Sequence, residues 1–140
     1  PGMTAPADLA TPADVHDLVT RFYREIVFDE LLEPIFGEVA EVDWAEHIPR
    51  LIDYWCWILF GTGGPSTSVT TVHRHLHDLA PIGPDHCDRW FTLWSTTIDA
   101  GWRGPSADRA RDHAETLMAG MAKHVFGFTW STPRPTVALG

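Results

Sequence analysis

Histidines are the side chains of this sequence best suited to holding a metal. Three of them alternate in the segment His73-Arg74-His75-Leu76-His77. On a strand, this spacing would place three imidazoles on one face, which is a plausible zinc or copper site. On a helix, His73 and His77 share a face but His75 does not, because residues four apart are neighbours there. The helical pattern around the segment favours the second arrangement, and surface histidines are the simpler interpretation of any two of the three.

Three other side chains with chemical potential fall on or beside the apolar faces of expected helices. His47 precedes Leu51 by four residues. Tyr23 precedes Ile26 by three residues, and Trp90 lies in the middle of an apolar stripe. Each of them alone is explained by packing, as a hydrogen-bonded core histidine or tyrosine or as a core tryptophan.

Taken together, these residues describe a cavity suited to haem. Haem iron takes an axial imidazole on one face, and hydrogen-bond donors on the other face hold bound dioxygen. His77 and His47 lie on separate expected helices, while the Tyr23 hydroxyl and the Trp90 indole supply donors. No nucleophile–base pair, phosphate-binding loop or carboxylate cluster in the sequence competes with this arrangement.

The elements that must position these side chains are helices. Apolar residues recur at three- and four-residue steps, and no window alternates with period two for long, which predicts an all-α fold. The first helix begins with a Thr11 cap and Pro12 in its first turn, and it extends to about Phe28. The second opens in Asp43-Trp44-Ala45-Glu46, the pattern of a capping box, and it stops before Gly61.

Two further helices complete the expected bundle. Pro49 lies inside the second helix, so either its first turn is irregular or the helix begins near His47. A third helix opens at Pro84, and Ser106 is expected to cap the last one. Residues 67–82 are the least regular part of the chain. Because each helix hides only one face, the helices must pack on each other.

A chain of 140 residues corresponds to one domain. We expect that domain to span residues 11–126, with a flexible leader over residues 1–10 and a flexible tail over residues 127–140. Cys56 and Cys87 both fall in apolar periodic segments, so buried free thiols are expected.

Composition argues against several classes of protein. Ten Lys and Arg stand against 19 Asp and Glu, a formal net charge of −9. Such a chain repels phosphate backbones and anionic lipids, so neither a nucleic-acid nor a membrane partner is expected. The longest apolar stretch, residues 54–60, is far short of the roughly 20 residues that span a bilayer. No signal-peptide pattern is present, so a cytoplasmic location is expected.

The order of several short motifs resembles that of truncated haemoglobins, a short bacterial form of the globin fold. The matching stretches lie within residues 11–126 and are Phe22-Tyr23, Pro34-Ile35-Phe36, Trp44-Ala45-Glu46-His47, Tyr54-Trp55, and His77-Asp78-Leu79-Ala80-Pro81-Ile82-Gly83-Pro84 leading to Asp88-Arg89-Trp90. The resemblance is to group III truncated haemoglobins, with group II features in the stretch from His77 to Pro84. It implies a two-over-two helical sandwich around haem b.

Carried over position by position, the resemblance implies a set of haem contacts. His77 resembles the proximal iron ligand, and His73, one helical turn earlier, is the alternative ligand. Phe36 resembles the phenylalanine that packs on the porphyrin. Arg50 is placed to reach a haem propionate, and Leu51 to line the distal face.

The distal residues implied by the resemblance are Tyr23, Trp90 and His47. They imply binding of dioxygen and of other diatomic ligands such as NO and CO, with an unidentified reductase as partner. NO dioxygenase or peroxidase-like activity is left open. Two alternatives from other classes also stay open: a zinc or copper protein that uses His73, His75 and His77, and a haem-free helical interaction module.

Overall fold

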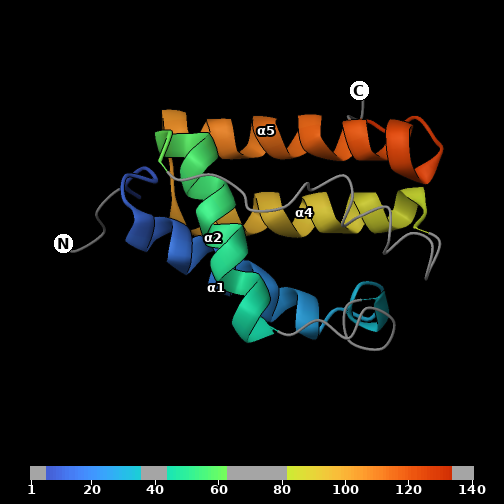
Figure 1. Cartoon of the computed structure of the whole chain (residues 1–140), viewed down its shortest axis with the longest axis horizontal. Helices are drawn as coiled ribbons and strands as arrows, with labels where there is room; N and C mark the ends of the chain where they lie inside the picture. Colours follow the sequence, from blue (N-terminus) through green and yellow to red (C-terminus); the bar gives the residue numbers. More distant parts are fainter. Residues whose placement is uncertain (1–5, 36–43, 63–81, 134–140) are drawn as a thin grey trace, which may run out of the picture.

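The computed structural model describes residues 6–35, 44–62 and 82–133. Its regular elements in these ranges are helical, which confirms the predicted all-α fold (Figure 1). Their order is α1 Pro12–Val27, α2 Trp44–Phe60, α4 Pro84–Gly101, α5 Pro105–Met121 and the π-helical turn η2 Ala122–Phe126.

The first helix, α1, begins as the sequence predicts. The Thr11 hydroxyl accepts a hydrogen bond from the backbone N–H of Asp14, while the Asp14 carboxylate accepts one from the backbone N–H of Thr11. This reciprocal pair satisfies amide groups that a helix start otherwise leaves unpaired. The buried face of α1 consists of Val15, Leu18, Val19, Phe22, Tyr23 and Ile26.

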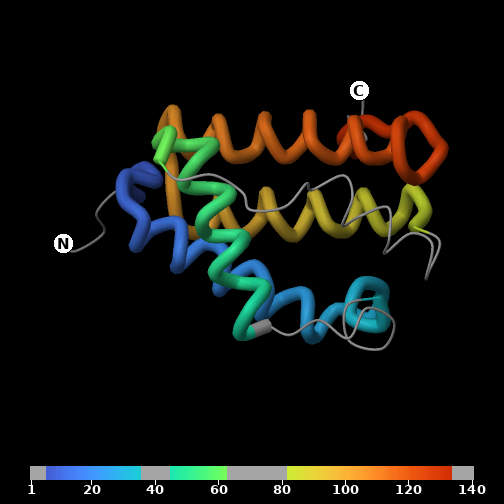
Figure 2. The backbone as a smooth tube through the Cα atoms, viewed as in Figure 1, coloured from blue at the N-terminus to red at the C-terminus, as the bar shows by residue number. Residues whose placement is uncertain are grey.

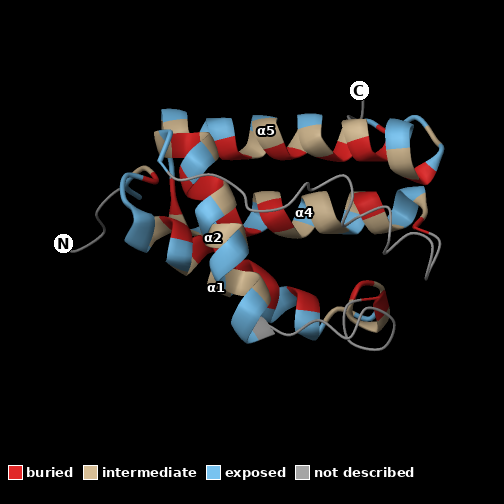
Figure 3. Ribbon diagram, in the orientation of Figure 1, coloured by how far each residue is buried: buried red, intermediate tan, exposed pale blue. Residues whose placement is uncertain are grey.

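The second helix, α2, runs from Trp44 and includes Pro49 near its start. It packs against α1 and also contacts α5. Helices α4 and α5 form an antiparallel pair that lies side by side, and α2 crosses obliquely to them (Figure 1). The two pairs, α1 with α2 and α4 with α5, make the expected two-over-two sandwich. Buried residues line the facing sides of α4 and α5 (Figure 3).

The described part of the expected leader is packed into the fold rather than flexible. The Leu9 side chain is fully buried in the core. The Asp8 carboxylate accepts hydrogen bonds from the backbone N–H groups of Ser106 and Ala107, at 2.9 and 2.8 Å. Figure 2 shows this segment beside the connection between α4 and α5. The prediction of a loose leader is therefore corrected for residues 6–10.

The same contacts correct the predicted cap of the last helix. Gly104 rather than Ser106 occupies the cap position of α5, and Pro105 is its first helical residue. Glycine offers no side chain to accept hydrogen bonds, and Asp8 takes that role from nearly 100 residues away in the sequence. Spacing along the helix could not reveal a cap supplied by a distant segment.

The described part of the expected tail, residues 127–133, also packs against the fold. The Trp130 side chain is only 7% exposed, and its indole N–H donates a hydrogen bond of 2.8 Å to the Asp88 carboxylate on α4. Phe91 packs edge-to-face against Trp130. Residues 127–133 are therefore part of the packed structure, although their prolines and their position near the chain end suggested otherwise.

Among the described residues, the buried side chains form two clusters. The larger joins the faces of α1, α2, α4 and the start of α5, and the smaller joins Ile35 and Ile82 to the other end of α4, α5 and η2. Trp90 and Phe91 are partly buried and pack against both clusters. These two residues therefore mark the junction between the clusters.

Both cysteines of the chain lie among the described residues. Cys56 and Cys87 are buried free thiols, as predicted. Burial, together with the charges of Asp88 and Asp85, raises the pKa of the Cys87 thiol to about 12, so the thiol is inert. Within the described ranges, no helix combines the length and the apolar character needed to cross a membrane.

Candidate functional site

Tyr23 and His47, predicted to share a site, lie against each other. Tyr23 comes from the buried face of α1, and His47 is half-buried on α2. Their ring centroids are 5.7 Å apart and the rings are nearly perpendicular, at 89°. Burial raises the pKa of the Tyr23 hydroxyl well above its usual value. The hydroxyl therefore keeps its proton at neutral pH and can act as a hydrogen-bond donor.

Trp90, on α4, lies one aromatic ring away from Tyr23. The Phe22 ring contacts both residues edge-to-face, with centroid distances of 4.9 Å to Tyr23 and 5.5 Å to Trp90. Trp90 is partly buried. Three helices thus bring a hydroxyl, an imidazole and an indole to neighbouring positions beside the junction of the two core clusters.

The two other described site candidates lie on α2. Leu51 follows His47 by one helical turn and is partly buried against the larger core cluster. Arg50 is exposed and forms an ion pair with Glu46, one turn earlier on the same helix. Its predicted contact with a haem propionate stays a prediction.

The proximal part of the predicted site lies outside the described residues. This applies to His77, to the neighbouring His73 and His75, and to Phe36. Among the residues that the structure does describe, no three His, Cys, Asp or Glu side chains are grouped in a way that could hold a metal ion. The zinc or copper alternative concerned only residues outside these ranges, so it stays untested.

One polar pair of the interior was missed from the sequence. The Tyr54 hydroxyl on α2 and the Nε2 atom of His113 on α5 are 2.6 Å apart, across 59 positions of sequence. Burial raises the pKa of Tyr54; burial and the nearby Arg109 charge lower that of His113. The only sequence signal was that each residue adjoins an apolar stripe, and pairing them required knowledge of how α2 meets α5.

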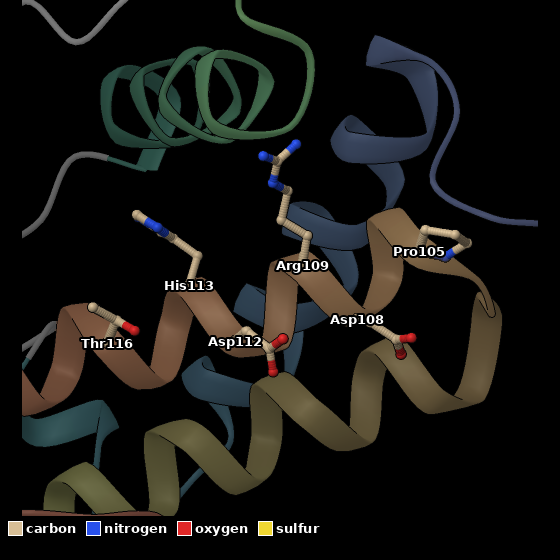
Figure 4. Close-up of a pocket in the computed structure, with 6 residues that line it drawn as sticks. All are labelled: Pro105, Asp108, Arg109, Asp112, His113 and Thr116. Atoms are coloured by element: carbon tan, nitrogen blue, oxygen red, sulfur yellow. The ribbon is translucent and has the colours of Figure 1, made fainter.

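A shallow, open pocket lies along α5 next to this pair. His113 and Arg109 extend from α5 on the side of α2, whereas Asp108 and Asp112 point elsewhere (Figure 4). The residues that line it are Pro105, Asp108, Arg109, Asp112, His113 and Thr116. None of the three residues Tyr23, His47 and Trp90 lines this pocket, so it is distinct from the site that they form.

Comparison with known proteins gives a match at the level of fold. No protein-family model and no curated protein matches the chain. Among solved structures, the chain is similar to a group III truncated hemoglobin from Campylobacter jejuni, with a TM-score of 0.77 and 18% sequence identity. The match covers 88% of this chain and 97% of that one. This chain has the truncated globin fold.

The truncated globin fold confirms the architecture that the short motifs predicted. At 18% identity the two sequences have few residues in common, so only short motifs of the family can be recognised in this chain. The fold alone does not assign a ligand, since one fold can host several functions. Function has to be argued from the residues of the site.

Proposed function

We propose that the chain binds haem b at the junction of its two core clusters and binds diatomic ligands such as dioxygen, NO and CO there. The observation that carries the proposal is the convergence of Tyr23, His47 and Trp90 from three helices of a truncated globin fold.

The described residues fit haem in two respects. The partly buried Trp90 and Phe91 present apolar surface at the junction, as a large flat macrocycle requires. Burial keeps the Tyr23 hydroxyl protonated, and the half-buried His47 ring lies against the Tyr23 ring. Hydrogen-bond donors beside apolar walls are the combination that decides how a haem pocket treats a bound ligand.

The proposal assigns the remaining contacts as the sequence implies them. His77 is proposed as the axial ligand, with His73 as the alternative one turn earlier. Phe36 packs on the macrocycle, and Leu51 lines the distal side. Arg50 releases Glu46 and pairs with a propionate, an exchange that costs little because an exposed ion pair contributes only about 0–1 kcal/mol.

The chemistry that haem supplies when bound is an iron that coordinates one imidazole and one diatomic ligand. Tyr23 and Trp90 would donate hydrogen bonds to a dioxygen ligand held in this pocket. Hydrogen bonds to charged groups are each worth about 1.5–3 kcal/mol. His47 lies against Tyr23 and is placed to orient its hydroxyl or to approach the iron itself.

Two donors make ligand escape slow, which suits some roles better than others. Slow escape favours removal of NO or peroxide over oxygen delivery. A role of that kind needs electrons from a reductase, so the proposal includes a reductase partner. Assays of NO and peroxide consumption with such a reductase determine whether the chain is an enzyme.

Visible absorbance tests the proposal directly. The purified chain, supplied with haem during expression, is expected to show an intense Soret band that shifts with carbon monoxide after reduction. His77→Ala is expected to lose or strongly weaken the band, and the neighbouring His75→Ala serves as the matched control that retains it. Loss of the Soret band in His73→Ala alone would identify His73, one helical turn earlier, as the axial iron ligand. Folded chain that stays colourless after reconstitution would overturn the proposal.

A further inference from the structure

Five aromatic side chains form a continuous path between the candidate site and the surface. We name them the aromatic array; in order they are Trp90, Trp94, Trp55, Tyr54 and Trp57. The Trp90 and Trp94 rings are parallel to within 10°, with centroids 6.0 Å apart. Trp94 stacks on Trp55 across the contact between α4 and α2, at 4.6 Å and 27°.

The outer part of the array lies on α2. The Tyr54 ring lies 5.6 Å from that of Trp55 and 6.1 Å from that of Trp57. The Trp57 side chain is 42% exposed. Each step of the array therefore joins neighbouring rings, from a tryptophan next to Phe22 in the interior to one in contact with solvent.

Tyr54 differs from the tryptophans because a base is in contact with it. Its hydroxyl oxygen lies 2.6 Å from Nε2 of His113, within hydrogen-bond distance. Burial lowers the pKa of His113, and the positive charge of Arg109 acts in the same direction. The imidazole is therefore neutral at neutral pH, and in the tautomer protonated at Nδ1 the Nε2 lone pair is available for the hydroxyl proton. Figure 4 shows His113 extending from α5 on the side that faces α2.

Trp94, in the middle of the array, has no such base. Its indole N–H donates to the backbone carbonyl of Ala110, at 3.1 Å, in a fully buried environment. An amide carbonyl accepts a hydrogen bond but does not take up a proton at neutral pH. An oxidised Trp94 would therefore keep its proton and remain a strong oxidant of its neighbours. Oxidation can pass through Trp94 but is not trapped there.

We propose that the aromatic array carries single oxidising equivalents from the interior to Tyr54, with His113 as the proton acceptor. In the final step, an oxidised tryptophan, as its radical cation, takes one electron from Tyr54 while the hydroxyl proton moves to Nε2 of His113. The products are a neutral tryptophan, a neutral tyrosyl radical and a protonated His113. A diffusible one-electron reductant such as ascorbate then returns the electron, and His113 returns the proton.

The array protects the interior by moving oxidation to a place where a solvent-borne reductant can repair it. Its inner end, Trp90, belongs to the candidate site and is linked to Tyr23 through the Phe22 ring. A protective role toward oxidants generated in that site rests on the proposed function. The electron path itself uses only the chain's own aromatic residues, so it is tested without reference to haem binding.

Pulse radiolysis of the purified full chain tests the path. Azidyl radicals oxidise tryptophan selectively, and tryptophanyl and tyrosyl radicals have distinct visible absorption bands. We expect the tryptophanyl signal to decay as the tyrosyl signal grows, at a first-order rate that does not depend on protein concentration. A concentration-dependent rate, or no tyrosyl signal, would overturn the proposal.

The sequence provides a matched control, because the chain has only two tyrosines. Tyr54→Phe is expected to abolish the tyrosyl signal, whereas Tyr23→Phe is expected to retain it. Persistence of the signal in Tyr54→Phe would show that Tyr54 is not the end of the path. Circular dichroism checks that each variant is folded.

Two further variants separate the proton acceptor from the electron relay. His113→Gln keeps a polar side chain but removes the base, and it is expected to slow tyrosyl formation about a hundredfold, the low end of what a positioned base contributes. Trp57→Phe removes the exposed tryptophan of the array, so that the tyrosyl radical can form only by electron transfer to the interior tryptophans of the array. Adding Trp55→Phe to this variant interrupts that path and is expected to abolish first-order formation of the tyrosyl radical. An unchanged rate in either test would contradict the assigned role.

Discussion

Burial determines what the individual polar side chains of this protein can do. Tyr23 is only 7% exposed, and loss of solvation keeps its hydroxyl protonated. The same effect acts in the opposite sense on His113, which it keeps neutral. Burial therefore leaves Tyr23 with a proton to donate and His113 without a positive charge, and neither property can be read from the sequence position alone.

The donor role of Tyr23 and Trp90 predicts how they affect ligand escape. Replacing either residue by Phe in the haem-loaded protein should accelerate dioxygen dissociation by about tenfold or more, because each hydrogen bond contributes about 1.5–3 kcal/mol. Stopped-flow displacement of dioxygen measures the rate. Tyr54→Phe is the matched control, since that hydroxyl is bonded to His113. Unchanged dioxygen dissociation rates in both variants would show that neither side chain stabilises the bound ligand.

Two glycines near α5 should respond in opposite ways to the same substitution. Gly104 has φ +144°, and a Cβ atom there would lie 2.6 Å from the Asp8 side chain. Gly104→Ala is therefore expected to destabilise the fold by at least about 1 kcal/mol. Gly120 lies within α5, with open space around its Cβ position. Gly120→Ala should stabilise by about 0.5–1 kcal/mol.

Urea denaturation of both variants measures this contrast. The two substitutions add the same methyl group, so their difference isolates backbone conformation and the contact with Asp8. Equal effects of the two substitutions would show that neither the positive φ nor that contact matters.

At the scale of elements, helix α5 depends on a segment remote in sequence. Its first backbone N–H groups are paired by Asp8, and the backbone N–H of Arg103 donates to the Ala7 carbonyl. The segment before α1 thus anchors the start of α5. These hydrogen bonds connect the first described residues to the pair of helices α4 and α5.

Removal of this cap should weaken the whole fold measurably. Asp8→Ala is expected to cost about 1 kcal/mol at neutral pH, the usual value of a helix N-cap. Asp17→Ala, which removes only an exposed ion pair with Arg21, should change stability by no more than about 0.5 kcal/mol. Denaturant unfolding compares the two variants, and equal losses would contradict the capping role.

The effect of Asp8 should also depend on pH in one direction. Burial raises the pKa of this carboxyl, but backbone hydrogen bonds from Ser106, Ala107 and Leu9 outweigh it and hold the pKa below 3.8. The stabilisation is therefore present well above pH 3.8 and is lost as the pH falls through the folded-state pKa. The stability difference between the native chain and Asp8→Ala should shrink on acidification. A stability difference that grew on acidification would contradict the lowered pKa of the Asp8 carboxyl.

At the scale of the whole molecule, the two core clusters meet at Trp90 and Phe91. In the proposed function, haem fills this junction and contacts both clusters. A ligand that binds only the folded state stabilises it in proportion to the logarithm of its concentration above the dissociation constant. Haem should therefore act as part of the core as well as the reactive centre.

Thermal unfolding tests this structural role. Haemin at 100 times its dissociation constant should stabilise the chain by about 2.7 kcal/mol and raise Tm accordingly. Metal-free protoporphyrin IX is the matched control: it offers the same flat surface without a bond to His77, so its effect should be smaller. Haemin that binds without any change in Tm would contradict a site between the clusters.

The sequence by itself determined the helices and their apolar faces. The three- and four-residue spacing of α1 specifies its buried side, and the reciprocal Thr11 and Asp14 cap specifies its start, because both depend on residues within one or two turns. The order of the motifs also indicated the truncated globin fold. The rings of Tyr23 and His47 lie close together, as the sequence led us to expect, because each residue occupies an inward or rim position of its own helix.

The tertiary structure decided every feature that joins distant segments. The Asp8 cap of α5, the burial of Leu9 and Trp130, and the hydrogen bond between Tyr54 and His113 each bridge elements that the sequence describes separately. Local periodicity reports which face of a helix is apolar, but not which residue of another helix meets it. That pairing depends on how the helices cross, and the crossing is set by packing of the whole core.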